Sequence, residues 1–206
     1  MPDISREKFI EFWGDGGYRQ NFDAGYDWRI DIENVLGKYS TGKDVLEIGC
    51  GDGYWTCEWL VPRFENIITI DLISRPNAFS GLNNIKHIAL PCADYSLSEI
   101  KDSSVGFVWS FGVFCHFTNM AVKEYLKSVY RVMRPGAYAV IMFANWEKHP
   151  DFKDKPAEYG IDPEPFCGWT CGNIDSIVGQ ITKAGFLFVE DSVPEFRDTL
   201  AVMRKP

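Results

Sequence analysis

The feature that most constrains the fold is the stretch DVLEIGCGDGYWT, residues 44–56, where a short apolar run leads directly into a glycine-rich turn. Such a turn lets a ligand approach the backbone closely, because glycine adopts conformations that a Cβ atom disfavours. Gly49, Gly51 and Gly53 follow a G-x-G-x-G spacing. This spacing differs from the G-x-G-x-x-G of dinucleotide-binding turns, and the G-K-[ST] of triphosphate-binding loops is missing. Glu47, just before the turn, disfavours a pyrophosphate and suits an ammonium or hydroxyl group.

Strand-like apolar runs alternate with helical patterns along the chain, which is typical of an α/β protein with a parallel sheet. The last two strand-like runs are joined by SVPEF, which is too short for a helical crossover, so this pair is expected to be antiparallel. The sequence therefore predicts a Rossmann-like, doubly wound, mostly parallel seven-stranded sheet that ends in an antiparallel hairpin. The expected strands are Asp44–Ile48, Ile67–Asp71, Ile85–Ala89, Val105–Ser110, Tyr138–Phe143, Phe186–Asp191 and Thr199–Arg204.

Two helices are predicted from apolar residues that recur every three or four positions. The first follows Thr118 and is expected to stop at Pro135-Gly136, and the second follows Asn173 and ends at Gly185. Thr118 and Asn173 suit the first position outside a helix, where their side chains can accept a hydrogen bond from the first turn.

Nothing in the chain suggests a linker or an internal repeat, so residues 1–206 are expected to form a single domain. Residues 1–40 contain helical patterns rich in aromatic residues and are expected to form an N-terminal helical cap. Residues 145–170 are irregular and rich in proline, and are expected to form a lid or an acceptor-binding loop.

Composition narrows the range of partners and locations. The formal net charge is −8, which makes nucleic acid a poor partner. No apolar run is long enough for a membrane helix, and the N-terminal residues do not form a secretory signal, so a cytoplasmic location without a membrane partner is expected. The six cysteines are expected to be free thiols, and no metal site is expected because the three histidines are scattered.

Polar residues follow the ends of the next strands. Asp71 ends the second strand, where a carboxylate of a doubly wound sheet can accept hydrogen bonds from ribose hydroxyls. Asp94 follows the third strand and can accept from an exocyclic amine, while Ser110 and Phe111 would line the crevice from the other side. An amine, a ribose and an adenine without a phosphate match S-adenosylmethionine. The alternative is that each aspartate only caps the helix that follows it.

The sequence resembles the class I S-adenosylmethionine-dependent methyltransferases, specifically the group that acts on small molecules. The resemblance lies in the segments DVLEIGCGDGYWT, IDLI, CADY, SFGVFCHF and RVMRPGAYAVIMF. It implies that S-adenosylmethionine is the cofactor and that Glu47, Gly49 and Gly51 surround its methionine part. It also implies that Ser110 offers a backbone carbonyl to the methionine ammonium.

The resemblance extends to the nucleoside end of the cofactor. It implies that Asp71 binds the ribose hydroxyls, that Leu72 packs on the adenine, and that Asp94 and Tyr95 lie at the adenine amine. Upstream, YDWRIDIENVL is similar to the helix that closes over the cofactor in this family. Its Trp28 and Arg29 could contact the methionine carboxylate, or could simply pack.

Methyl transfer is an in-line displacement, in which the enzyme mainly supplies alignment and desolvation. An alcohol acceptor also needs a base near its hydroxyl. His116 is the best candidate because the loop after the fourth strand borders the methyl group in this fold. The alternative is a histidine that only shapes the pocket.

The acceptor is expected to be a small molecule, because the NPPY-like motif of amide and adenine N-methyltransferases is missing. The SFGVFCHF segment and the aromatic-rich 145–170 segment are loosely similar to methyltransferases that act on sugars and glycan precursors. Sugar O-methylation is therefore the leading prediction, and N-methylation of a small amine or amino acid is the alternative. The aromatic residues available for an acceptor pocket are Tyr18, Tyr26, Trp146, Phe166 and Trp169.

Two other classes of function compete with an active methyltransferase. A nicotinamide oxidoreductase would need the x-x-G spacing and normally a Tyr-Lys pair, and neither is found. A non-catalytic module that binds S-adenosylmethionine would keep Glu47, Asp71 and Asp94 and is compatible with the sequence. The oligomeric state is left open.

Overall fold

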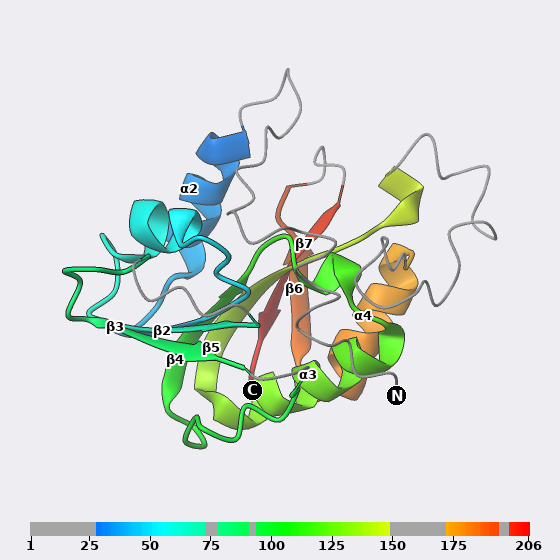
Figure 1. Cartoon of the computed structure of the whole chain (residues 1–206). Helices are drawn as coiled ribbons and strands as arrows, with labels where there is room; N and C mark the ends of the chain where they lie inside the picture. Colours follow the sequence, from blue (N-terminus) through cyan, green and yellow to red (C-terminus); the bar gives the residue numbers. More distant parts are fainter. Residues whose placement is uncertain (1–27, 73–77, 91–93, 149–171, 194–197) are drawn as a thin grey trace.

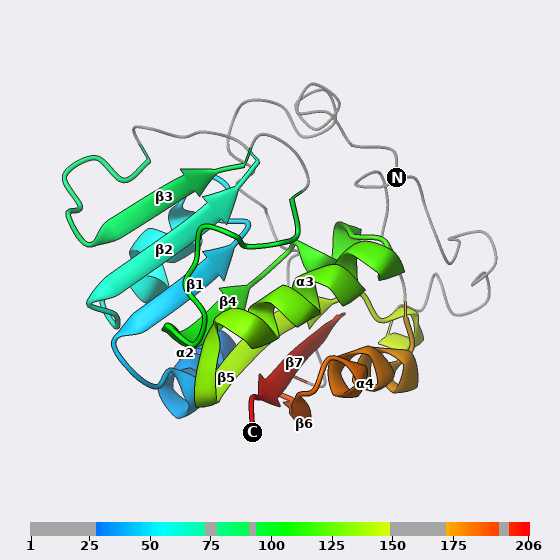
Figure 2. The ribbon, with the colours of Figure 1, turned by 90° about the horizontal axis from the view of Figure 1, so that it is seen from below.

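A computed structural model describes residues 28–72, 78–90, 94–148, 172–193 and 198–206. These residues form a seven-stranded sheet in the order β3-β2-β1-β4-β5-β7-β6. The strands β1 to β5 are parallel, and β7 runs antiparallel to both β5 and β6. In Figure 2 the arrow of β7 points opposite to those of β1, β2 and β3. The expected doubly wound sheet with its antiparallel end is confirmed. The strands are β1 (Asp44–Ile48), β2 (Asn66–Asp71), β3 (Ile85–Ala89), β4 (Val105–Ser110), β5 (Met133–Phe143), β6 (Leu187–Asp191) and β7 (Thr199–Arg204).

Helices cover both faces of this sheet (Figure 1). One face carries α2 (Trp28–Tyr39) and the short π-helix η1 (Thr56–Leu60), and the other carries α3 (Asn119–Val132) and α4 (Ile174–Lys183). Each face has its own apolar core, because alternate residues of each strand point to opposite faces. Among the described residues, no helix has both the length and the apolar character needed to cross a membrane.

The two helices predicted from periodicity begin where their capping residues indicate. The Thr118 side chain accepts a hydrogen bond from the backbone N–H of Ala121 at 3.2 Å, and Asn173 accepts from Ser176 at 2.9 Å. These bonds satisfy N–H groups that the first turn of a helix leaves without an internal partner.

The junction between α3 and β5 differs from the expectation. The helix ends at Val132 and the strand begins at Met133, so Pro135 and Gly136 lie inside the strand rather than before it. Gly136 adopts a φ of 81°, and its N–H donates to the carbonyl oxygen of Lys205 at 2.9 Å. Pairing of Met133 with Val105 of β4, together with this contact to Lys205, therefore extends the strand back through the Pro-Gly pair.

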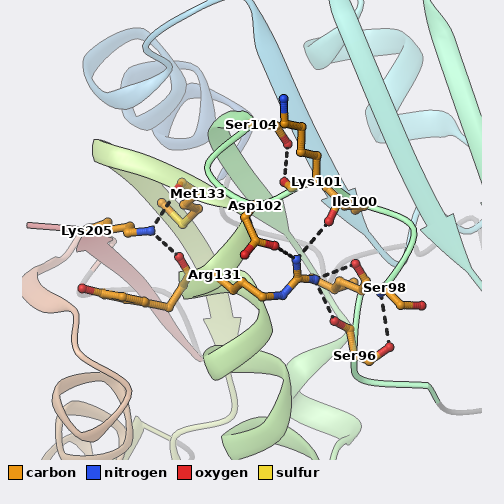
Figure 3. Close-up of polar contacts among 11 residues, drawn as sticks. Ser96, Ser98, Ile100, Lys101, Asp102, Ser104, Arg131, Met133 and Lys205 are labelled. Carbon is orange, nitrogen blue, oxygen red and sulfur yellow. Dashed lines mark hydrogen bonds and ion pairs between the residues drawn. The ribbon is translucent and has the colours of Figure 1, made fainter.

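The crossover from β3 to β4 contains no helix within its described residues, 94–104. Instead the segment wraps around the guanidinium of Arg131, at the end of α3, as Figure 3 shows. This group pairs with Asp102 and donates to the carbonyl oxygens of Ser96 at 3.1 Å, Leu97 at 2.8 Å and Ile100 at 3.1 Å. A single side chain thereby fixes the path of the chain just after Asp94.

Candidate functional site

The site lies where the order of the strands reverses. Strand β1 has β2 on one side and β4 on the other, and ligands of such sheets bind at the carboxyl ends of the strands beside this reversal. The Ser110 hydroxyl, at the end of β4, donates to the carbonyl oxygen of Ile48 at 2.8 Å. A Cβ atom on Gly49 would come within 2.1 Å of the Val113 side chain. The turn after β1 and the loop after β4 are therefore in direct contact.

The glycine turn combines two covered positions with an open one. Gly49, Gly51 and Gly53 have φ values of 79°, 55° and 80°, a region that other residues rarely adopt. The space beside Gly49 is filled by Val113 and that beside Gly53 by Phe79, whose ring would lie 2.6 Å from an added Cβ. Gly51 is exposed, and an added Cβ there would meet nothing within 4 Å. A ligand can therefore approach the backbone at the middle glycine.

Asp71 lies directly beside this open glycine. The backbone N–H of Gly51 donates to the Asp71 carboxylate at 2.8 Å, which ties the end of β2 to the turn after β1. The Asp71 side chain is half-buried. The structure thus brings together two of the residues that the sequence assigned to one ligand.

Asp94 does not cap a helix, so the capping alternative is wrong for this residue. Its two carboxylate oxygens accept from the backbone N–H and the hydroxyl of Ser96, at 2.8 Å and 2.9 Å. Tyr95 is half-buried, and its ring meets the edges of Tyr125 and Phe117 at centroid distances of 5.1 Å and 6.2 Å. Asp94 therefore closes a tight turn that the Arg131 network holds against α3.

Glu47 is 1% exposed and lies beneath the turn rather than on its surface. Its carboxyl accepts a hydrogen bond from the Thr56 hydroxyl at 2.5 Å, which links β1 to the start of η1. The pKa of Glu47 is raised to about 8, mainly by burial; the Thr56 hydrogen bond opposes this shift and the negative charge of Asp71 adds to it. Glu47 is therefore largely protonated at neutral pH.

Two further sequence-predicted residues of the cofactor site adjoin Asp71 and Ser110 in the chain. Leu72 is half-buried against the α3-side core. Phe111 is buried, stacked on Trp109 at 5.9 Å and edge-on to Trp55 at 5.7 Å, so it anchors the loop after β4 to the α2-side core. Arg29 is exposed at the start of α2.

His116 is half-buried in the 3-10 turn η2 (Phe114–His116), which follows β4. Its backbone N–H donates to the carbonyl oxygen of Val113 at 2.9 Å. Since Val113 contacts Gly49, His116 belongs to the loop that borders the glycine turn.

The predicted acceptor residues are not placed by the described part of the chain. Tyr18, Tyr26, Phe166 and Trp169 lie outside the described residues. Trp28 belongs to α2 and Trp146 to η3 (Trp146–Lys148), but their side chains are also outside what the structure describes. Within the described ranges, no group of three or more His, Cys, Asp or Glu residues is arranged to hold a metal ion.

Sequence reasoning missed the residues that support the turn. Thr56 and Val113 contact Glu47 and Gly49, and Thr69 and His87 lie beneath the turn on β2 and β3. One signal was present, because Thr69 and His87 are polar residues inside otherwise apolar strands. Their partners depend on strand register, which the sequence does not reveal.

Known proteins resemble this chain in part of its sequence and in its fold. A family described as a methyltransferase domain matches residues 46–141, which include the glycine turn, Asp71, Asp94 and the loop after β4. No curated protein matches the chain at a significant level.

Solved structures share the fold at low sequence identity. The N-methyltransferase NodS from Bradyrhizobium japonicum WM9, in complex with S-adenosyl-L-homocysteine, is 17% identical with a TM-score of 0.66, covering 98% of each chain. The 1,6-didemethyltoxoflavin-N1-methyltransferase of Burkholderia thailandensis is 16% identical with a TM-score of 0.66, covering 98% of this chain and 87% of that one. The [4+2]-cyclase SpnF is 13% identical with a TM-score of 0.65, covering 93% and 87%.

The family match contains the glycine turn and its acidic partners, and the sheet that presents them has the topology expected for this family. Residues 46–141 therefore match a methyltransferase domain, and the sheet that carries them has the fold of S-adenosylmethionine-dependent methyltransferases.

Proposed function

We propose that this enzyme transfers a methyl group from S-adenosylmethionine to a small-molecule acceptor. The methionine part of the cofactor would lie at Gly49 and Gly51, near the backbone carbonyl of Ser110, and the ribose at Asp71. The adenine would lie between Leu72 and the Asp94-Tyr95 pair. The observation that carries this proposal is the open, exposed backbone of Gly51, which is hydrogen-bonded to the Asp71 carboxylate.

The charges around the turn fit this cofactor. Asp52 and Asp71 lie in or beside the turn, and residues 44–56 contain no lysine or arginine. Carboxyl groups accept hydrogen bonds from an ammonium or a hydroxyl, whereas they repel a phosphate. S-adenosylmethionine offers an ammonium and two ribose hydroxyls and has no phosphate, so the residues present fit it.

When bound, the cofactor would supply an electrophilic methyl group on a sulfonium. The protein aligns the acceptor and excludes water. His116 would accept the proton of an acceptor hydroxyl, because its loop borders the turn through the contact of Val113 with Gly49.

We propose two classes of acceptor, sugar hydroxyls and small amines. Sugar or glycan-precursor hydroxyls are favoured by the loose likeness of the SFGVFCHF segment, and no neighbour reported above bears a name that supports them. A small amine or amino acid gains support from NodS and the toxoflavin enzyme, which are both named as N-methyltransferases. The aromatic residues Tyr18, Tyr26, Trp146, Phe166 and Trp169 are proposed for the acceptor pocket in either case.

Asp71→Ala is expected to weaken binding of S-adenosylhomocysteine by about 1–3 kcal/mol, because two ribose hydroxyls lose their acceptor. Isothermal titration calorimetry measures this change directly. Asp175→Asn, in the exposed first turn of α4, is the matched control and should bind normally. Equal affinity of the Asp71 variant and the wild type would contradict the ribose role.

The reaction is tested by S-adenosylhomocysteine release with sugars, nucleotide sugars, amines, amino acids and phenols. With a hydroxyl acceptor, His116→Ala should lower kcat by about 10²–10⁴-fold while cofactor affinity stays unchanged. An unchanged kcat with such an acceptor would show that His116 is not the base. Tight cofactor binding without turnover across the whole panel would favour the non-catalytic module over an enzyme of this substrate class.

A further inference from the structure

A row of polar residues crosses the sheet directly beneath the glycine turn. Glu47 of β1 is in register with Thr69 of β2, and Thr69 is in register with His87 of β3. Two residues earlier in each strand, the corresponding row consists of Val45, Ile67 and Ile85, which belong to or pack against the α2-side core. Polar side chains in such a position are costly to bury unless they make hydrogen bonds. Apolar packing alone therefore does not explain why polar residues occupy this row.

His87 connects this row to the turn through one ring nitrogen. Its Nδ1 lies 2.8 Å from the Thr69 hydroxyl and 3.8 Å from the Cys50 sulfur. Cys50 stands between Gly49 and Gly51 and is 2% exposed. The other ring nitrogen, Nε2, is buried and has no hydrogen-bond partner among the described residues. Within the described part of the chain, the polar contacts of the His87 ring therefore all involve Nδ1.

The His87 ring also reaches the turn through Phe79. The two ring centroids are 5.6 Å apart, and the same Phe79 ring fills the space beside Gly53. His87 thus supports the turn on both sides of Gly51, through Cys50 before it and through Phe79 after it. Gly51 is the residue whose N–H holds Asp71.

We infer that His87 is a positioning residue for the cofactor: it holds the glycine turn from below, so that Gly51 stays in place beside Asp71. The opposite end of the turn is held by the other end of the row, through the hydrogen bond of Glu47 with Thr56. The row is then a support for the turn, which explains why polar residues occupy it. This inference rests on the proposed binding of the cofactor at the turn.

Two substitutions separate the role of Nδ1 from that of the rest of the ring. In His87→Asn the amide lies near the position of Nδ1, whereas in His87→Gln it lies near that of Nε2. His87→Asn should keep the Kd for S-adenosylhomocysteine within about threefold of wild type, and His87→Gln and His87→Leu should weaken it by about tenfold, the effect of losing one hydrogen bond. Calorimetry on the full chain measures each Kd, and thermal unfolding measures each Tm.

A merely structural role would give a different pattern. Affinity would then follow Tm across the three variants, and the apolar leucine would be tolerated at least as well as asparagine. Either that pattern or a glutamine variant that binds better than the asparagine variant would overturn the inference. If the wild-type chain itself failed to bind S-adenosylhomocysteine, the proposed function would fail first.

A double-mutant cycle tests the path through Cys50. Cys50→Ala removes the sulfur that lies 3.8 Å from Nδ1 and leaves the ring in place. If His87 acts through Cys50, the losses in affinity of His87→Leu and Cys50→Ala should be smaller together than their sum. Fully additive losses would show that the two residues act independently, and the path through Cys50 would be wrong.

Discussion

Gly49→Ala is expected to abolish measurable binding of S-adenosylhomocysteine and to lower the free energy of unfolding by roughly 2–5 kcal/mol. Two effects add at this position. The φ of 79° disfavours any residue with a Cβ atom, and the new methyl group would lie 2.1 Å from Cγ2 of Val113. The turn and the loop after β4 would have to separate, and the cofactor is proposed to bind where they meet. Urea unfolding and calorimetry measure the two losses.

Gly81 offers a matched control for this prediction. It has a φ of 83°, close to that of Gly49, but an added Cβ would meet nothing within 4 Å. Gly81→Ala should therefore cost only the backbone strain, about 1–2 kcal/mol, and leave cofactor affinity unchanged. Adding Val113→Ala to Gly49→Ala should recover part of the lost stability by removing the clash. Equal losses in the two single glycine variants would show that the contact with Val113 is unimportant.

Much of the fold could be predicted because its signals are local. The strands are short apolar runs, and Thr118 and Asn173 cap their helices through hydrogen bonds within three residues. The start of β5 could not be predicted in this way, since Met133 pairs with Val105 of β4 across a shift in register and Gly136 bonds to Lys205 at the other end of the chain. The path from β3 to β4 likewise depends on Arg131, which follows it in the sequence.

In the candidate site, too, some features can be predicted from the sequence and others depend on packing between distant segments. The pairing of Gly51 with Asp71 could be anticipated, because both follow neighbouring parallel strands whose carboxyl ends meet. The position of Glu47 beneath the turn and its bond to Thr56 could not, because the sequence does not show how the chain after the turn packs. The sequence does not single out His87, because its partners, Thr69 and Cys50, become neighbours only through strand register and the shape of the turn.

Glu47→Gln is expected to remove a pH dependence of stability that the raised pKa of Glu47 predicts for the wild-type chain. The pKa of Glu47 is about 8 in the folded chain against an ordinary value of 4.5, so between these values the folded state holds a proton that the unfolded state has lost. The free energy of unfolding of the wild type should then fall as pH rises from 4.5 to about 8, by roughly 3–5 kcal/mol from this group. Glutamine is neutral throughout and can still accept from Thr56. Urea unfolding across this window should therefore give a flatter profile for the variant, and parallel profiles would contradict the raised pKa.

Binding of the cofactor is expected to change the protonation of Glu47. An ammonium held at the turn favours the ionised form of a nearby carboxyl, so binding of S-adenosylhomocysteine at neutral pH should release part of the proton that Glu47 carries. Calorimetry in buffers of different ionisation enthalpy counts the protons released, and Glu47→Gln should release fewer than the wild type. Because Asp71 is also close to the turn, Asp71→Ala is the control: its affinity should fall while proton release persists. Equal release by the wild type and Glu47→Gln would place the ammonium away from Glu47, and the cofactor would then have to lie differently in the turn.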